Sequence, residues 1–105
     1  MKLNFDEALE LIGEGRSVDA DNVQTRALSR RVWVAEWHVP GCLSESFSAC
    51  ATRAAAIECA LDMCGNVRGA LSDLIKHGRT DRVSPDAYVG RAITTVYSDT
   101  LGGLL

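Results

Sequence analysis

One stretch, residues 31–64, constrains the fold more than any other part of the chain. It opens with VWVAEWHV at residues 32–39, a run rich in β-branched and aromatic side chains that predicts a strand. Pro40 and Gly41 end this strand, because proline lacks an amide hydrogen and glycine tolerates positive φ. Residues 43–49 then alternate apolar and serine side chains, so we expect an antiparallel return strand with one face in water.

An alanine-rich helix is predicted to follow the two strands. Thr52 is a suitable N-cap, because its hydroxyl can accept an amide hydrogen bond, and Gly65 is typical of the residue that follows a helix. Apolar residues at i, i+3, i+4 and i+7 form one stripe of this helix: Ile57, Ala60, Leu61 and Cys64. Side chains alternate across a strand, so Trp33 and Trp37 share a face. We expect the helix to cover that face and to bury both indoles.

The sequence before these two strands and their helix predicts one helix and contains one ambiguous region. Asn4 and Glu7 have the spacing of a capping box, which predicts a helix that ends near Gly13 and Gly15. Residues 17–28 alternate in a way that favours a strand, although a second helix fits almost as well. We choose the strand.

The sequence after the two strands and their helix predicts a helix, a loop, a strand and a final turn. Residues 66–77 form an amphipathic pattern closed by Gly78, with apolar positions at Val67, Leu71, Leu74 and Ile75. Residues 79–86 are polar and predict a loop. Residues 88–98 favour a strand over a helix, because they contain a run of high β propensity. The leucines and glycines of residues 100–105 predict one helical turn.

These elements predict one α+β domain spanning residues 1–105. It should hold an antiparallel sheet of three to four strands with two or three helices packed on one face. A hydrophobic content of 47% and a charged content of 24% suit a single folded core of this length. Apolar runs are shorter than the ~18 residues that cross a membrane, and acids interrupt the N-terminus where a signal peptide needs an apolar core. We therefore expect a cytoplasmic protein with reduced cysteines and no membrane partner.

The charges are unevenly distributed, although the formal net charge is only −3. Acids are concentrated on the first predicted helix, and three arginines follow in the next segment. The candidate partner-binding residues are Asp6, Glu7, Glu10, Glu14, Arg26, Arg30 and Arg31. The acidic residues suit a basic protein partner, although a helix face in water would use them too. The arginine cluster is small and flanked by acids, so nucleic-acid binding is the less favoured use of it.

Four cysteines and two histidines are the candidates for metal or catalytic chemistry. The spacings His38-x3-Cys42, Cys42-x7-Cys50 and Cys59-x4-Cys64 differ from those of paired zinc knuckles. A Glu36–His38–Cys42 nucleophile is disfavoured, because neighbours on one strand face are ~7 Å apart. The chain also lacks the established catalytic motifs. We predict no enzyme activity, no metal and no cofactor.

The sequence VWVAEWHVPGCL, followed by Thr52 and the alanine-rich helix, resembles small accessory proteins of phages and mobile elements. These are β-β-α proteins with a Trp-His-x-Pro-Gly-Cys-Leu turn, mostly without assigned function. The Pro-Gly-Cys turn and the capped helix also resemble the HicB antitoxin fold. The chain departs from HicB because about ten residues separate Cys42 from Thr52 and no C-terminal DNA-binding module is evident.

The resemblance implies a non-enzymatic accessory protein that binds a host or viral protein stoichiometrically. Inhibition of a host defence system, as by anti-CRISPR proteins, is one form of this activity. An alternative is a HicB-like antitoxin or nucleic-acid-binding regulator that uses Arg26, Arg30 and Arg31. A zinc-binding domain is the third interpretation. An exposed edge strand would also allow a homodimer.

Overall fold

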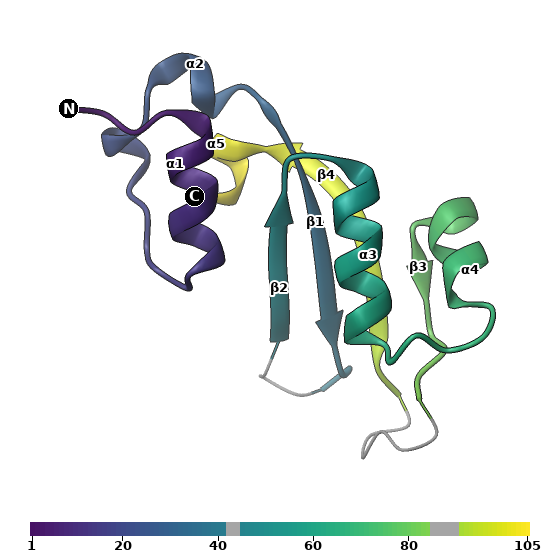
Figure 1. Ribbon diagram of the computed structural model, residues 1–105. Helices are drawn as coiled ribbons and strands as arrows, with labels where there is room; N and C mark the ends of the chain where they lie inside the picture. The colour runs from purple at the N-terminus through teal and green to yellow at the C-terminus, as the bar shows by residue number, and fades with distance from the viewer. Residues whose placement is uncertain (42–44, 85–90) are drawn as a thin grey trace.

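The computed structural model describes residues 1–41, 45–84 and 91–105. These residues form a four-stranded antiparallel sheet in the order β2-β1-β4-β3 (Figure 1). The strands are β1 (Arg31–His38), β2 (Glu45–Cys50), β3 (Arg79–Thr80) and β4 (Ile93–Thr100). The predicted α+β fold with an antiparallel sheet is confirmed.

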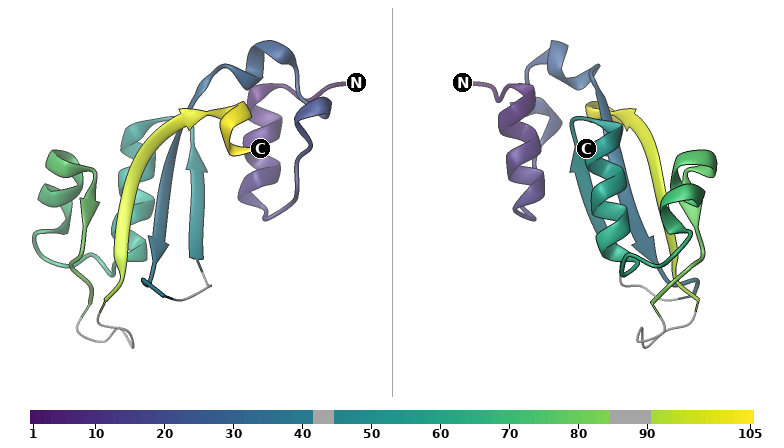
Figure 2. Two further views of the ribbon diagram at one scale, coloured as in Figure 1. Left: turned by 180° about the vertical axis from the view of Figure 1, so that it is seen from behind. Right: turned by 45° about the vertical axis from the view of Figure 1, so that its right-hand side comes forward.

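The described residues also contain five α-helices and one 3-10 turn. The helices are α1 (Phe5–Gly13), α2 (Thr25–Leu28), α3 (Arg53–Met63), α4 (Ala70–His77) and α5 (Leu101–Leu104), and the turn covers Ala20–Asn22. Helix α3 lies across the sheet, α1, α2 and α5 gather at one end, and α4 lies beside β3 at the other end (Figures 1 and 2). The molecule is therefore elongated, with principal extents of 47 × 27 × 18 Å.

The predicted hairpin and helix form the centre of the molecule. In β1, Ala35 lies opposite Ser48 of β2 and opposite Val96 of β4, so β1 is one of the two inner strands. Thr52 caps α3, because its hydroxyl accepts a hydrogen bond from the amide of Ala55 at 3.2 Å. Helix α3 packs on the predicted face of β1, in a cluster of buried residues: Ala35, Ala56, Ile57, Ala60, Leu74 and Val96.

The expectation that α3 buries both indoles is wrong. Trp33 and Trp37 are each half-buried. Their strand face does turn towards α3, but Ala56 and Ala60 are the residues that this helix buries beside Ile57. Alanine side chains are short, so the helix closes over Ala35 and leaves part of each larger ring in water.

A second cluster packs on the opposite side of β1. Val32 points away from the α3 face by strand alternation, and it is fully buried. The cluster joins it to residues of α1, α2, α5 and the segment before α2: Phe5, Ala8, Val23, Ala27 and Leu101. Helices therefore contact both sides of the sheet, with α3 on one side and α1, α2 and α5 on the other, and the expectation that they pack on one face is wrong. We call α1, α2, α5 and the segments that join α1 to α2 the lobe.

The capping box of α1 is confirmed, whereas the strand predicted for residues 17–28 is wrong. Asn4 Oδ1 accepts from the Glu7 amide at 2.9 Å, and Glu7 Oε1 accepts from the Asn4 amide at 3.1 Å. Residues 17–28 instead contain the 3-10 turn, a single parallel bridge at Val23 and helix α2. Val23 and Ala27, four residues apart, are both buried in the lobe. Thr25, which lies between them, is exposed, so burial in this segment does not follow the two-residue alternation of a strand.

The C-terminal predictions are confirmed in outline and corrected in detail. Helix α4 ends at Gly78, which has a left-handed φ of 68°. Within its predicted apolar stripe Leu74 is fully buried, but Leu71 and Ile75 are 48% and 51% exposed. The predicted loop at 79–86 begins with the short strand β3, which pairs with β4. The predicted strand is β4 and the final turn is α5, and residues 85–90 lie outside the described part of the chain.

Candidate functional site

The acidic candidates lie on α1, and three of them share one concave surface. Glu7, Glu10 and Glu14 line a depression of about 260 Å³, which we call the acidic groove. Its lining residues are Leu3, Glu7, Glu10, Leu11, Glu14 and Arg16. Asp6 is exposed in the first turn of α1 but is not among them. The helical spacing of 7, 10 and 14 places these three carboxylates on one face of α1.

A second depression, also of about 260 Å³, has a mainly apolar lining. We call it the apolar groove. It is lined by Ile12, Arg16, Ser17, Val18, Phe47, Leu104 and Leu105. Phe47 is 46% exposed and Leu105 is 37% exposed, so much apolar surface remains in water. Arg16 lines both grooves, which have no other lining residue in common.

The arginine candidates are only partly brought together. Arg26 and Arg30 line a depression of about 330 Å³ with Asn4, Phe5, Gln24 and Ala27. The guanidinium carbon of Arg30 lies 3.9 Å from the centroid of the Phe5 ring, which is a cation–π contact. Arg31 is exposed at the start of β1 and is not among the lining residues. The structure therefore groups two of the three arginines.

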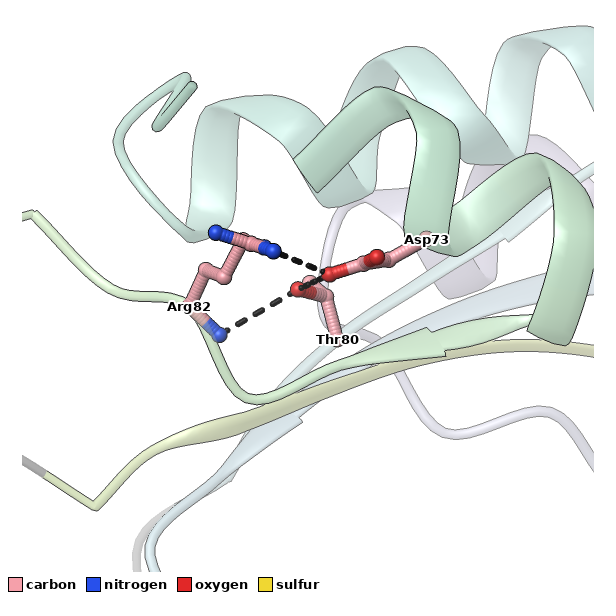
Figure 3. Close-up of polar contacts among 3 residues, drawn as sticks. All are labelled: Asp73, Thr80 and Arg82. Atoms are coloured by element: carbon pink, nitrogen blue, oxygen red, sulfur yellow. Dashed lines mark hydrogen bonds and ion pairs between the residues drawn. The ribbon is translucent and has the colours of Figure 1, made fainter. Parts of the chain in front are cut away.

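A polar network that the sequence analysis missed lies at the opposite end of the molecule. Asp73 of α4 accepts hydrogen bonds at Oδ2 from the Thr80 hydroxyl at 2.9 Å and from Arg82 Nε at 2.8 Å (Figure 3). The Arg82 amide also donates to the Thr80 hydroxyl at 3.2 Å. The hydrogen bond from Thr80, followed by that from Arg82, holds the pKa of Asp73 below its usual value. Asp73 is therefore an ionised clamp between α4 and the segment after β3.

A glycine lies beside the clamp. Gly69 is the N-cap of α4 and has a left-handed φ of 91°, and a Cβ atom there would lie 2.9 Å from Cζ of Arg82. The guanidinium of Arg82 thus packs against bare backbone while its Nε holds Asp73. The three clamp residues line a depression of about 580 Å³ together with His77, Arg79 and Asp81. Because its carboxylate is already paired, Asp73 is better suited to holding α4 than to transferring a proton.

The cysteines and histidines of the described residues form no metal centre. Within residues 1–41, 45–84 and 91–105, no group of three or more His, Cys, Asp or Glu is placed to hold a metal ion. Cys42 lies outside these ranges, so the Glu36–His38–Cys42 interpretation has no described geometry. Cys64 is buried and its thiol donates to the Leu61 carbonyl at 3.4 Å, as expected of a small core residue.

Comparison with protein-family models, with curated proteins and with solved structures finds no match to this chain. Across the described residues, no helix combines the length and the hydropathy that a membrane-spanning segment requires. The proposals below therefore rest on the geometry of this chain alone.

Proposed function

We propose that the chain is a non-enzymatic protein-binding module that acts stoichiometrically on its partner. Its binding surface would be the acidic groove together with the apolar groove, and its ligand a protein segment that carries both basic and apolar side chains. The observation behind this proposal is that Arg16 lines both grooves. An accessory protein of a phage or mobile element that inhibits a host or viral protein would use such a surface.

The placement of charge on α1 supports a role in binding. Glu10 lies in the last turn of α1 and Glu14 is its C-cap, and that turn contains no basic residue. The C-terminal end of a helix carries partial negative charge, so a carboxylate there costs about 0.3–1 kcal/mol. Arg16 Nη1 lies 3.9 Å from Glu14 Oε2, but both side chains are exposed, and such a pair contributes little. A cationic partner would relieve this repulsion.

The apolar groove supplies the complementary part of the surface. Phe47 projects from β2 and Leu105 ends the chain, and both keep more than a third of their surface in water. Burial of apolar area stabilises a complex by roughly 25 cal/mol per Å² before the entropic cost of association. Aromatic residues are common at the centres of protein interfaces. Phe47 is thus the expected anchor, and the carboxylates would speed association and select the partner.

A displayed library of random peptides tests the proposal with the full chain as bait. We expect enrichment of peptides in which Lys or Arg lies near an apolar residue. The triple variant E7Q/E10Q/E14Q should weaken the binding of a selected peptide at least tenfold at low salt, and added salt should reduce this difference. Phe47→Ser should weaken binding at all salt concentrations, because it removes apolar contact.

The control is E58Q/D62Q, which removes two exposed carboxylates from α3. This variant should bind selected peptides as the wild type does. Enrichment of peptides without basic residues would contradict the proposal. So would a triple variant that binds as tightly as the control.

One observation favours a second candidate, binding of a nucleic acid. Arg26 and Arg30 share a depression with the amide side chains of Asn4 and Gln24, a mixture that suits phosphate and base contacts. Fluorescence anisotropy with labelled single-stranded DNA and RNA, repeated across a salt series, distinguishes the candidates. Salt-dependent binding that R26A/R30A abolishes would favour this second function.

A further inference from the structure

Two thiols and a hydroxyl meet where β2 packs against α3. Cys50 ends β2 and Cys59 lies in the middle of α3, and their Sγ atoms are 3.8 Å apart. The Ser48 hydroxyl lies 3.6 Å from Cys59 Sγ and 3.8 Å from Cys50 Sγ. Both cysteines are free, and each residue is half-buried rather than sealed in the core.

The topology brings the two thiols together. Ser48 and Cys50 are two residues apart on β2, so their side chains point to the same face, and this face turns towards α3. Cys50 and Cys59 both pack at the margin of the cluster that joins α3 to the sheet. A disulfide has an S–S length of about 2.05 Å, so the sulfurs need to approach by roughly 1.8 Å.

We propose that Cys50 and Cys59 are a redox modification site, at which a hydroperoxide converts the two thiols into a reversible intramolecular disulfide. One thiol attacks the peroxide O–O bond, becomes a sulfenic acid and releases one molecule of water or alcohol. The second thiol attacks the sulfenic sulfur, the S–S bond forms, and a molecule of water leaves. The two thiols lose two electrons and two protons, and the peroxide accepts both. A dithiol reductant reverses the change by exchange.

The product would tie the edge strand β2 to α3. In the reduced protein, burial raises the pKa of the Cys50 thiol, so this thiol stays protonated at neutral pH. Because the thiolate is the reactive form, attack by Cys50 on a peroxide is slow. Ser48 donates a hydrogen bond to Cys59 Sγ.

The test treats the reduced full chain with hydrogen peroxide and follows the intact mass. We expect loss of two hydrogen atoms, restored by dithiothreitol. Trypsin cleaves after Arg53 and so separates Cys50 from Cys59, which leaves a disulfide-linked pair of peptides 32–53 and 54–68. Each peptide contains a second cysteine, Cys42 or Cys64, so fragment ions must assign the bonded sulfurs.

Matched variants make the assignment independent of the fragment ions. C42S and C64A should form the bond as the wild type does, whereas C50S and C59S should not. The proposal is overturned if the bond persists in C50S or C59S, if the fragment ions join a different pair, or if only sulfinic acid accumulates. Should C50S or C59S fail to fold by circular dichroism, the fragment ions of the wild type decide the result.

Discussion

Replacement of Leu74 by alanine tests the packing of α4 most directly. Leu74 is fully buried and belongs to the cluster around α3 and the sheet. Leu→Ala removes three carbon atoms, and at ~0.8 kcal/mol each their transfer from water is worth about 2.4 kcal/mol. The cavity left behind adds to this loss, so we expect L74A to lower the free energy of unfolding by about 3 kcal/mol. For a domain of this size the melting temperature should fall by roughly 12 °C.

The matched control is Leu71→Ala on the same helix. Leu71 is 48% exposed, so about half of its transfer energy is at stake, and alanine favours a helix slightly more than leucine does. We expect L71A to cost about 1 kcal/mol or less. Urea unfolding, followed by circular dichroism, measures the free energy of unfolding of both variants. The two curves are fitted with one shared dependence of this free energy on urea concentration. Equal costs for the two variants would refute the placement of α4, because the sequence pattern alone treats both leucines as members of one apolar stripe.

Three further perturbations follow from the charges and polar groups. The double variant E10Q/E14Q should raise the free energy of unfolding by up to about 1 kcal/mol in urea titrations, because it removes negative charge from the C-terminal end of α1, while peptide binding weakens. Unchanged stability would show that the helix end does not oppose these carboxylates. The pKa of Asp73 is lowered on folding, so its contribution to stability is complete above the unfolded value of 3.8 and is lost as the pH falls through the folded value. Urea titrations at descending pH should therefore show a smaller acid-induced loss for D73N than for the wild type, and parallel curves would contradict the clamp. Thr94 is fully buried and its hydroxyl has no hydrogen-bond partner among the described residues. Thr94→Val should therefore raise the unfolding free energy by about 1 kcal/mol, and a loss of that size would reveal a partner for the hydroxyl.

Local sequence signals correctly predicted those features that depend only on residues close in the sequence. The capping box at Asn4 and Glu7, the cap at Thr52 and the left-handed Gly78 each act within a few residues, and each lies where the pattern predicted. The hairpin was also predictable, because Pro40 and Gly41 interrupt a long β-rich run. Such signals require no knowledge of the tertiary structure.

The strand prediction for residues 17–28, made from the same kind of local pattern, was wrong for a physical reason. Their alternation at Val23, Thr25 and Ala27 has the period of a strand, but no neighbouring strand is placed to pair with most of the described segment. Val23 and Ala27 instead enter the lobe core from a 3-10 turn and from α2. Tertiary packing overrode a short and weak local preference.

The indoles show how residue size limited the prediction. The strand face of Trp33 and Trp37 was correctly assigned, yet the depth of burial depends on the helix that covers it. Helix α3 presents alanines at its closest approach, which allows close contact with Ala35 but covers little area beyond it. Alternation in a strand fixes direction, whereas burial depends on the reach of side chains from another element.

The candidate binding surfaces depend on tertiary structure even more strongly. For this reason the sequence predicted the acidic residues of α1 but not the apolar groove. Glu7, Glu10 and Glu14 belong to one helix, so their shared face follows from helical spacing. The apolar groove combines Ile12, Phe47 and Leu105, which lie far apart in the chain and meet only after folding. A surface that joins a local acidic face to a non-local apolar groove requires the whole fold to be in place. The binding proposal therefore predicts that affinity and folding are lost together in denaturant, because an isolated α1 peptide would keep the carboxylates without the groove.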